Sequence, residues 1–179
     1  MRRYLAALTV VVSVSPALAL DMPPRKAGLW ELTMKFESRN IPGQTMKHCI
    51  DAATDRLMSA NTGGGLPQQN CDKQDVTHAG GMTIVDSVCH YGGATTTSHA
   101  EITGDFNSAY TMQVTTKRQG APAPGMPASG ETRMTIAAKW LGPCGAGQRP
   151  GDIIMSNGMK MNVLDMRGAG GVPRVPPQR

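Results

Sequence analysis

The sequence lacks the short motifs that mark the common enzyme classes. No G-x-S-x-G, H-E-x-x-H or phosphate-cradling glycine motif occurs in its 179 residues, and the three glycines at 63–65 are not followed by Lys-Ser or Lys-Thr. Asp86, within MTIVDSV, is interpreted as a solvated strand residue rather than a buried carboxylate. We therefore expect no enzyme and no cofactor, and an enzyme with an unrecognised site is the weakest alternative.

Long hydrophobic runs are missing after the first twenty residues. Two arginines precede an apolar stretch at 5–14, and Ala-Leu-Ala at 17–19 is an A-x-A cleavage signal. The stretch is too short for a membrane span, which takes about 20 apolar residues. No cysteine lies before Cys49 to carry a lipid anchor. We predict a signal peptide at 1–19, no transmembrane segment, and a periplasmic or secreted bacterial protein.

A basic patch on the folded body is not expected either, although the formal net charge is +5. Of the 18 lysines and arginines, two lie in the leader and three follow Asp165, which leaves thirteen against 13 acidic residues. A nucleic-acid-binding domain carries its surplus charge on the fold itself, so no nucleic-acid partner is expected. The Gly/Pro-rich end at 166–179 is predicted to be a disordered tail.

Apolar and polar residues alternate through most of the remaining chain, as they do in half-buried strands. The segments WELTMKFE, at 30–37, and ETRMTIAAKW, at 131–140, show this pattern. One polar face per strand favours an antiparallel sheet, and Asn157-Gly158 is a strong hairpin signal. We predict a mainly all-β fold, a curved antiparallel meander sheet or a partly closed barrel of seven to nine strands.

One segment departs from this alternation. DAATDRLMSA, at 51–60, starts with an aspartate suited to cap a helix and is rich in alanine. We predict one short helix near residues 51–60 that closes an end of the sheet. Residues 20–165 are predicted to form a single antiparallel β domain.

The four cysteines all lie in the part expected to be exported, where oxidation is the default. Their even number predicts two disulfides, and their spacing, with no C-x-x-C pair, predicts no metal site. Two connectivities are considered. We favour Cys49–Cys71 with Cys89–Cys144, because directly facing cross-strand cysteines often meet with poor geometry. The alternative is Cys71–Cys89 with Cys49–Cys144.

Aromatic residues are scarce, with two Trp, three Tyr and two Phe, whereas the chain has 13 methionines. Several methionines fall on predicted apolar strand faces, where this flexible side chain fills gaps in a core. Thioethers also bind Cu(I), so a Met-based copper binder is a minor alternative. Its candidate ligands cluster near the C-terminus: Met155, Met159, Met161 and Met166.

Several short segments resemble a known family in their order along the chain. They are PPRKAGLWE, KHCID before the predicted helix, the middle cysteines, WLGPC, and PGD followed by NGMKMNVL. The chain resembles the exported bacterial proteins of domain-of-unknown-function family 3617 over roughly residues 24–165. The threonine-proline usual after the first cysteine is replaced by Asp51-Ala52. The resemblance implies an exported, β-rich domain with paired cysteines, and it brings no catalytic residues.

Besides the enzyme and the copper binder, two further functions are considered, and we favour the first. The first is a non-enzymatic binding module for a small apolar ligand or lipid, since strongly curved sheets can enclose one small ligand. If a cavity exists, we expect it to be lined by Trp30, Met34, Met134 and Trp140. The second is an envelope interaction or structural protein, which would use an exposed sheet edge or the 120–130 loop.

Overall fold

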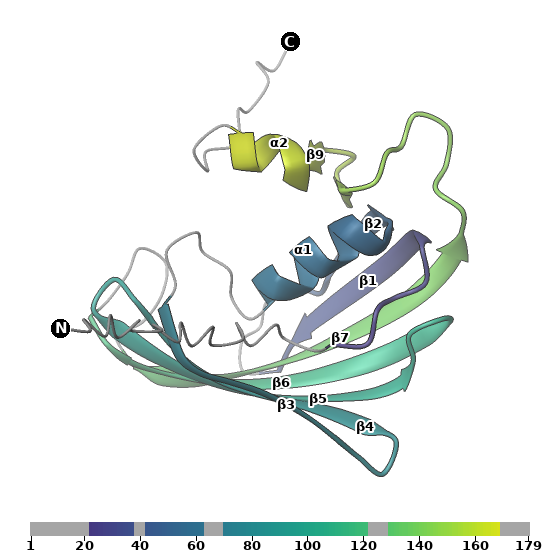
Figure 1. The fold of residues 1–179 in the computed structure, drawn as a ribbon. Helices are drawn as coiled ribbons and strands as arrows, with labels where there is room; N and C mark the ends of the chain where they lie inside the picture. The colour runs from purple at the N-terminus through teal and green to yellow at the C-terminus, as the bar shows by residue number, and fades with distance from the viewer. Residues whose placement is uncertain (1–21, 38–41, 63–69, 122–128, 169–179) are drawn as a thin grey trace, which may run out of the picture.

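The computed structural model describes residues 22–37, 42–62, 70–121 and 129–168. They form one nine-stranded antiparallel sheet and two short helices (Figure 1). In chain order the elements are β1 (Gly28–Phe36), β2 (Gln44–Ile50), α1 (Ala52–Thr62), β3 (Asn70–Ala79), β4 (Met82–Tyr91), β5 (Ala94–Asp105), β6 (Ala109–Gly120), β7 (Gly130–Gly142), β8 (Asp152–Met155), β9 (Lys160–Asn162) and α2 (Val163–Gly168).

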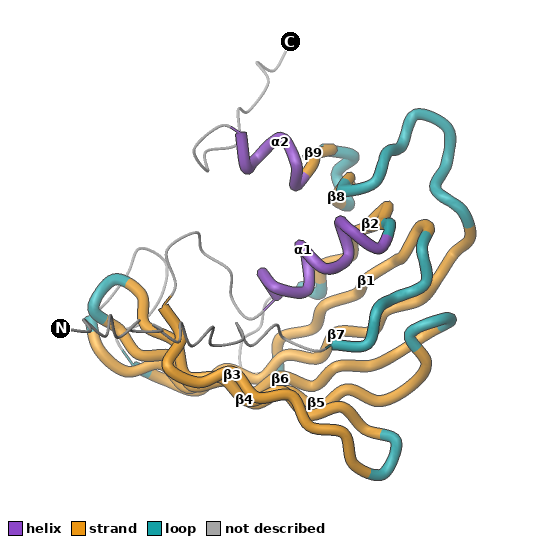
Figure 2. Tube along the Cα trace, in the orientation of Figure 1, coloured by secondary structure: helices purple, strands orange, loops and turns teal. Residues whose placement is uncertain are grey.

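The sheet is open and strongly curved, and both helices lie on its concave side (Figures 1 and 2). Its order is β3-β4-β5-β6-β7-β1-β2-β8-β9, so β3 and β9 are the edges of the described sheet. Strands β3 to β7 form a meander, and β1 lies between β7 and β2. The mainly β, antiparallel fold is confirmed; the sheet does not close into a barrel.

Paired glycines make the two tightest hairpins. Gly80 and Gly81 join β3 to β4, and Gly92 and Gly93 join β4 to β5, all four with positive φ between 56° and 78°. Two consecutive positive φ values define the type I′ turn, whose twist matches that of the flanking strands. The hairpin expected around Asn157-Gly158 is also present, as β8 paired with β9.

Helix α1 has the predicted start at Asp51. The Thr54 backbone N–H donates to Asp51 Oδ1 at 2.8 Å, and the Asp51 N–H donates to Thr54 Oγ1 at 3.0 Å. This reciprocal arrangement satisfies two backbone donors at the helix start. The hydrogen bonds from the backbone and then the side chain of Thr54 lower the pKa of Asp51.

The core lies between the concave face and the helices. Its buried side chains come mainly from alternate positions of β1, β5, β6 and β7, joined by Met58 of α1 and Val163 of α2: Trp30, Leu32, Ile50, Met58, Ala100, Ile102, Tyr110, Met112, Ile136, Ala138 and Val163. Apolar residues at alternate positions of the two segments at 30–37 and 131–140 therefore lie in or against this core, as expected for half-buried strands.

Helix α2 was not expected from the sequence. It follows β9 directly and continues to Gly168, three residues beyond the expected end of the domain at Asp165. Met166 packs against the core, so the ordered domain extends past that boundary. The predicted signal peptide and residues 169–179 of the predicted tail lie outside the described residues.

Candidate functional site

A cavity of about 280 Å³ lies between the concave face of the sheet and the two helices. Every layer around it contributes side chains: the segment before β1, strands β1, β2, β6, β7 and β8, the turn after β5, and both helices. The lining residues are Met22, Pro23, Arg25, Leu32, His48, Met58, Ser59, Phe106, Tyr110, Met112, Ile136, Ile153, Val163 and Met166.

Most of this lining is apolar and deformable. Four thioethers, two aromatic rings and several aliphatic side chains account for ten of the fourteen residues, with Pro23 in addition. The Phe106 and Tyr110 rings stack with centroids 4.9 Å apart. Methionine has three rotatable bonds and makes favourable contacts with aromatic rings, so such a wall can adapt to a guest.

A buried ion pair closes one side of the cavity. Arg25 Nε lies 2.7 Å from Asp55 Oδ1, and the Arg25 backbone N–H donates to Asp55 Oδ2 at 2.8 Å. Both side chains are more than nine-tenths buried. The pair joins the segment before β1 to the first turn of α1 and neutralises the guanidinium charge. Burial raises the pKa of the neighbouring Tyr110 hydroxyl.

His48, on β2, is another titratable residue of the lining. Burial, together with the positive charge of Arg25, lowers the pKa of His48 from 6.5 to about 4. Its Nε2 lies 3.2 Å from Met46 Sδ, and no residue in the described part of the chain forms a hydrogen bond with its buried Nδ1. A thioether can only accept, so Nε2 carries the proton and Nδ1 is left as a bare acceptor.

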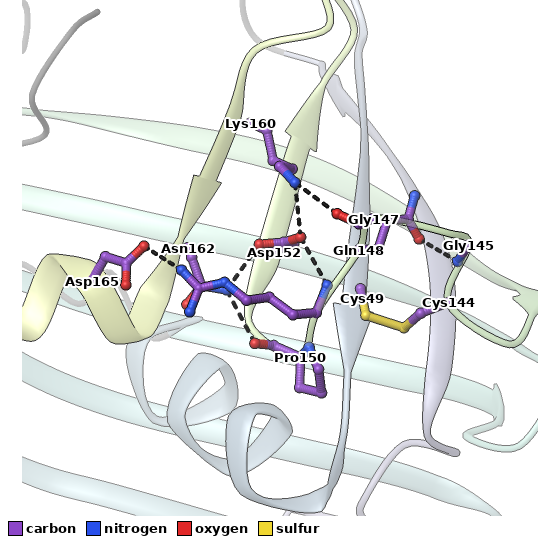
Figure 3. Close-up of polar contacts among 11 residues, drawn as sticks. Cys49, Cys144, Gly145, Gly147, Gln148, Pro150, Asp152, Lys160, Asn162 and Asp165 are labelled. Atoms are coloured by element: carbon purple, nitrogen blue, oxygen red, sulfur yellow. Dashed lines mark hydrogen bonds and ion pairs between the residues drawn. A yellow bond between two sulfur atoms is a disulfide. The ribbon is translucent and has the colours of Figure 1, made fainter.

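A polar network holds the wall that α2 and β8 contribute (Figure 3). Asp152, only 1% exposed, accepts from Asn162 Nδ2 at 2.9 Å and from the Arg149 backbone N–H at 3.0 Å, and lies 3.5 Å from Lys160 Nζ. Burial alone would raise the pKa of Asp152, but these contacts outweigh it and the pKa is lowered. Asp152 is therefore a charged anchor for the β8–β9 hairpin.

Asn162 connects this anchor to α2. Its Nδ2 also donates to the Pro150 carbonyl at 3.1 Å, and its Oδ1 accepts from the Leu164 backbone N–H at 2.9 Å. The same side chain thus binds Asp152 and caps the helix. An ion pair between Arg149 and Asp165 adds a second connection. The network positions Ile153, Val163 and Met166 over the cavity.

The two predicted disulfides are present, but the favoured pairing is wrong. Cys49 bonds Cys144 and Cys71 bonds Cys89. Cys71 lies on β3, six strands along the sheet from Cys49 on β2, which is about 29 Å at ~4.8 Å per strand. Cys71 instead faces Cys89 directly, because an irregularity at Asp72 shifts the register of β3 against β4.

The Cys49–Cys144 disulfide crosses the end of β1. Leu29 of β1 pairs with Cys49 on one side and with Gly142 on the other. Two residues after Gly142, Cys144 turns back and reaches Cys49, with the Cα atoms 5.5 Å apart. The bond therefore fastens β2 and β7 across the strand between them, beside the Asp152 network (Figure 3).

The four candidate lining residues from the sequence lie on the concave side, yet none is among the lining residues of the cavity. Trp30 is fully buried, and its Nε1 donates to the Lys26 carbonyl at 2.8 Å. Trp140 of β7 pairs with Trp30 of β1, and Lys26 Nζ lies 3.7 Å from the centroid of the Trp140 ring. Met34 and Met134 are partly buried beside the core. Their role in binding stays a prediction.

The C-terminal methionines are distributed among different elements. Met155 lies on β8, Met161 on β9 and Met166 on α2, whereas Met159, in the turn, is 43% exposed. Of the four, Met166 lines the cavity. In the described ranges, no group of three or more His, Cys, Asp or Glu side chains is placed to hold a metal ion.

The sequence interpretation missed Arg25, His48 and Tyr110 as lining residues. A signal for His48 was present, since Met46, His48 and Ile50 occupy alternate positions and share the inner face of β2. Arg25 precedes the first strand, and its burial depends on Asp55 of α1, thirty residues later. No local pattern indicates that contact.

Comparison with known proteins identifies the family. The family model described as "Protein of unknown function (DUF3617)" matches residues 25–144. No curated protein and no solved structure gives a significant match to the chain. Among the described residues, no helix is long and apolar enough to cross a membrane. The matched region contains β1 to β7, α1 and all four cysteines, and the chain belongs to the DUF3617 family.

Proposed function

We propose that this protein is a non-enzymatic binding module for a small apolar ligand, which it holds in the cavity under α1 and α2. The observation that carries the proposal is the cavity of about 280 Å³ with a largely apolar lining. Ligand sites are typically concave and mostly apolar, with a few polar groups that fix orientation. Arg25, His48, Ser59 and Tyr110 are polar groups of that kind.

The size of the cavity limits the ligand. It is roughly twice the ~150 Å³ apolar cavity that accepts benzene, so it suits a body of about ten to twelve non-hydrogen atoms. A bicyclic hydrocarbon matches this size. A longer lipid chain would need space beyond the cavity.

Export belongs to the same proposal. Two disulfides favour an oxidising compartment, in agreement with the signal peptide predicted at 1–19. In a periplasmic or extracellular setting the module would sequester or carry its ligand without changing it.

Titration with naphthalene, followed by protein NMR, tests the proposal. We expect one molecule per chain, with chemical-shift changes concentrated on the lining residues. Filling the cavity with Ile136→Trp, or from the helix side with Met166→Trp, should weaken binding at least about tenfold, which corresponds to 1.4 kcal/mol.

Met134→Trp is the matched control, since Met134 lies two residues from Ile136 on the same face of β7 but does not line the cavity. It should retain the wild-type affinity. Absence of naphthalene binding to the wild type would refute the proposal. Loss of binding in Met134→Trp alone would place the ligand at the residues expected from the sequence instead.

The envelope interaction role remains a prediction. The sheet does leave β3 as an edge, but β3 carries Asp72, Lys73 and Asp75, and charged residues commonly protect an edge from pairing. Most of the 120–130 loop lies outside the described residues.

A further inference from the structure

We propose, building on the binding function above, that the ligand is a neutral apolar molecule with one hydroxyl or N–H donor, and that this donor binds Nδ1 of His48. Nδ1 is buried and has no hydrogen-bond partner among the described residues, although His48 lines the cavity. A buried polar atom without a partner is energetically costly, so native proteins rarely keep one without a use.

The tautomer of His48 decides which ligand group fits. The contact of Nε2 with the thioether of Met46, at 3.2 Å, requires the proton on Nε2. Nδ1 therefore offers a lone pair and accepts a hydrogen bond. An alcohol, a phenol or an indole-like N–H complements it, whereas a carboxylate or an ether oxygen would face it with a second lone pair.

The charges around the cavity also disfavour an anion. Arg25 is the one cationic residue of the lining, and the Asp55 carboxylate already binds its Nε and backbone N–H. The guanidinium is thus already paired with a carboxylate inside the fold. A ligand carboxylate would have to compete with Asp55 for it while losing its own hydration.

Access to Nδ1 requires movement of side chains, because the atom is shielded from solvent by the surrounding residues. The cavity wall provides side chains that can move, since four of its residues are methionines with three rotatable bonds. Binding of the donor would then relieve the unpartnered nitrogen at a small conformational cost.

Three probes of similar size test the inference at neutral pH: naphthalene, 2-naphthol and 2-naphthoate. We expect 2-naphthol to bind about tenfold more tightly than naphthalene, as one net hydrogen bond of about 1–1.5 kcal/mol provides. In His48→Phe, which keeps a flat ring, this preference should disappear while naphthalene still binds. His99→Phe, on the opposite face of the sheet, should keep the full preference.

The outcomes separate the two proposals. If no probe binds, the binding function itself is wrong. If naphthalene and 2-naphthol bind equally to the wild type, or the preference persists in His48→Phe, the cavity binds ligands but Nδ1 is not the anchor. Tightest binding of 2-naphthoate would identify an anion site and overturn the inference.

A second measurement uses the wild-type protein alone, so it does not depend on whether a variant folds. Nitrogen-15 NMR of the imidazole should show Nε2 protonated and Nδ1 bare in the free protein. Addition of 2-naphthol should shift the Nδ1 resonance in the direction of hydrogen bonding, whereas naphthalene should leave it in place. A protonated Nδ1 in the free protein would contradict the inference.

Discussion

Two regions of the sheet are held together in different ways. The hairpin region, β3 to β5, consists of sequence neighbours joined by Gly-Gly turns, and its disulfide links residues separated by 18 positions. The covered region, β1, β2 and β6 to β9 with both helices, joins distant parts of the chain, and its disulfide spans 95 positions. Local pairing organises the first region, whereas long-range closure, with its larger entropic cost, organises the second.

The inner face of β4, within the hairpin region, is more polar than the inner face of the covered region. In the hairpin region, Thr83 and Ser87 are buried on the concave side of β4, each 6% exposed. In the covered region, the equivalent face carries Leu32 and Ile136, which line the cavity. The cavity thus lies where large apolar side chains of the sheet are covered by the helices.

Removing each disulfide in turn should give the largest effects on the free energy of unfolding, and these effects should differ between the two regions. The double change Cys49→Ser with Cys144→Ser should lower the free energy of unfolding by about 4–5 kcal/mol, because the bond closes a loop of 95 residues. Cys71→Ser with Cys89→Ser should cost about 3 kcal/mol, since that separation is 18. Denaturant unfolding of both variants measures these losses.

Naphthalene titration of the same two variants sharpens the comparison. The first variant should bind naphthalene more weakly, because Cys49–Cys144 fastens the frame of the cavity, whereas the second should bind as the wild type does. Equal losses of stability and equal binding would show that the two regions do not differ in this way.

Acid should destabilise the covered region through His48. The pKa of His48 is about 4 in the folded protein and 6.5 without burial, so between these values the unfolded chain binds a proton that the folded chain excludes. The free energy of unfolding should thus fall by about 3 kcal/mol as the pH drops from 6.5 to 4, and this contribution should level off below pH 4.

His48→Phe isolates that contribution, because Arg25 and Asp55, the charged groups beside His48, and all other carboxylates remain. The difference between the two stability curves should follow the titration of one histidine. A wild-type curve parallel to that of the variant from pH 7 to 4 would contradict the pKa assigned to His48.

The hairpin region should show a small effect of opposite sign. His99 on β5 contacts Asp86 Oδ1 at 2.8 Å and Glu101 Oε1 at 3.3 Å, and these hydrogen bonds, that of Asp86 first, raise the pKa of His99. Its contribution is present at pH values below 6.5 and is lost as the pH rises through the higher folded pKa.

The size of this effect is limited by solvent, because the His99 side chain is 47% exposed. His99→Ala should change the free energy of unfolding at pH 5.5 by at most about 0.5 kcal/mol. NMR titration of the imidazole measures the pKa directly, and a value below 6.5 would show that the contacts with Asp86 and Glu101 do not persist in solution.

Local features of this fold could be predicted from sequence, and long-range ones could not. Alternation indicated the strands that contain Trp30 and Ile136, and Asp51 marked the start of α1, because these signals depend on adjacent residues. The order of the strands depends on which edges meet, and the insertion of β1 between β7 and β2 decides the disulfide pairing. Helix α2 was missed because its six residues are too few to show a helical period.

The cavity was the least predictable feature for the same reason. Its lining combines residues from Met22 to Met166, and each contributes through a tertiary contact rather than a motif. His48 shares the inner face of β2 with Met46 and Ile50, and this position was not used as a signal. Inner-face position, rather than residue type, was the informative signal.

The nested arrangement of the disulfides also sets a requirement for biosynthesis. A chain that enters an oxidising compartment with its N-terminus first exposes Cys49 before the other cysteines, and the next to arrive is Cys71, which is not its partner. Oxidation in order of arrival would join the wrong pair. The native fold therefore requires that Cys49 stay reduced until Cys144 has emerged, or that thiol–disulfide exchange reshuffle an early bond.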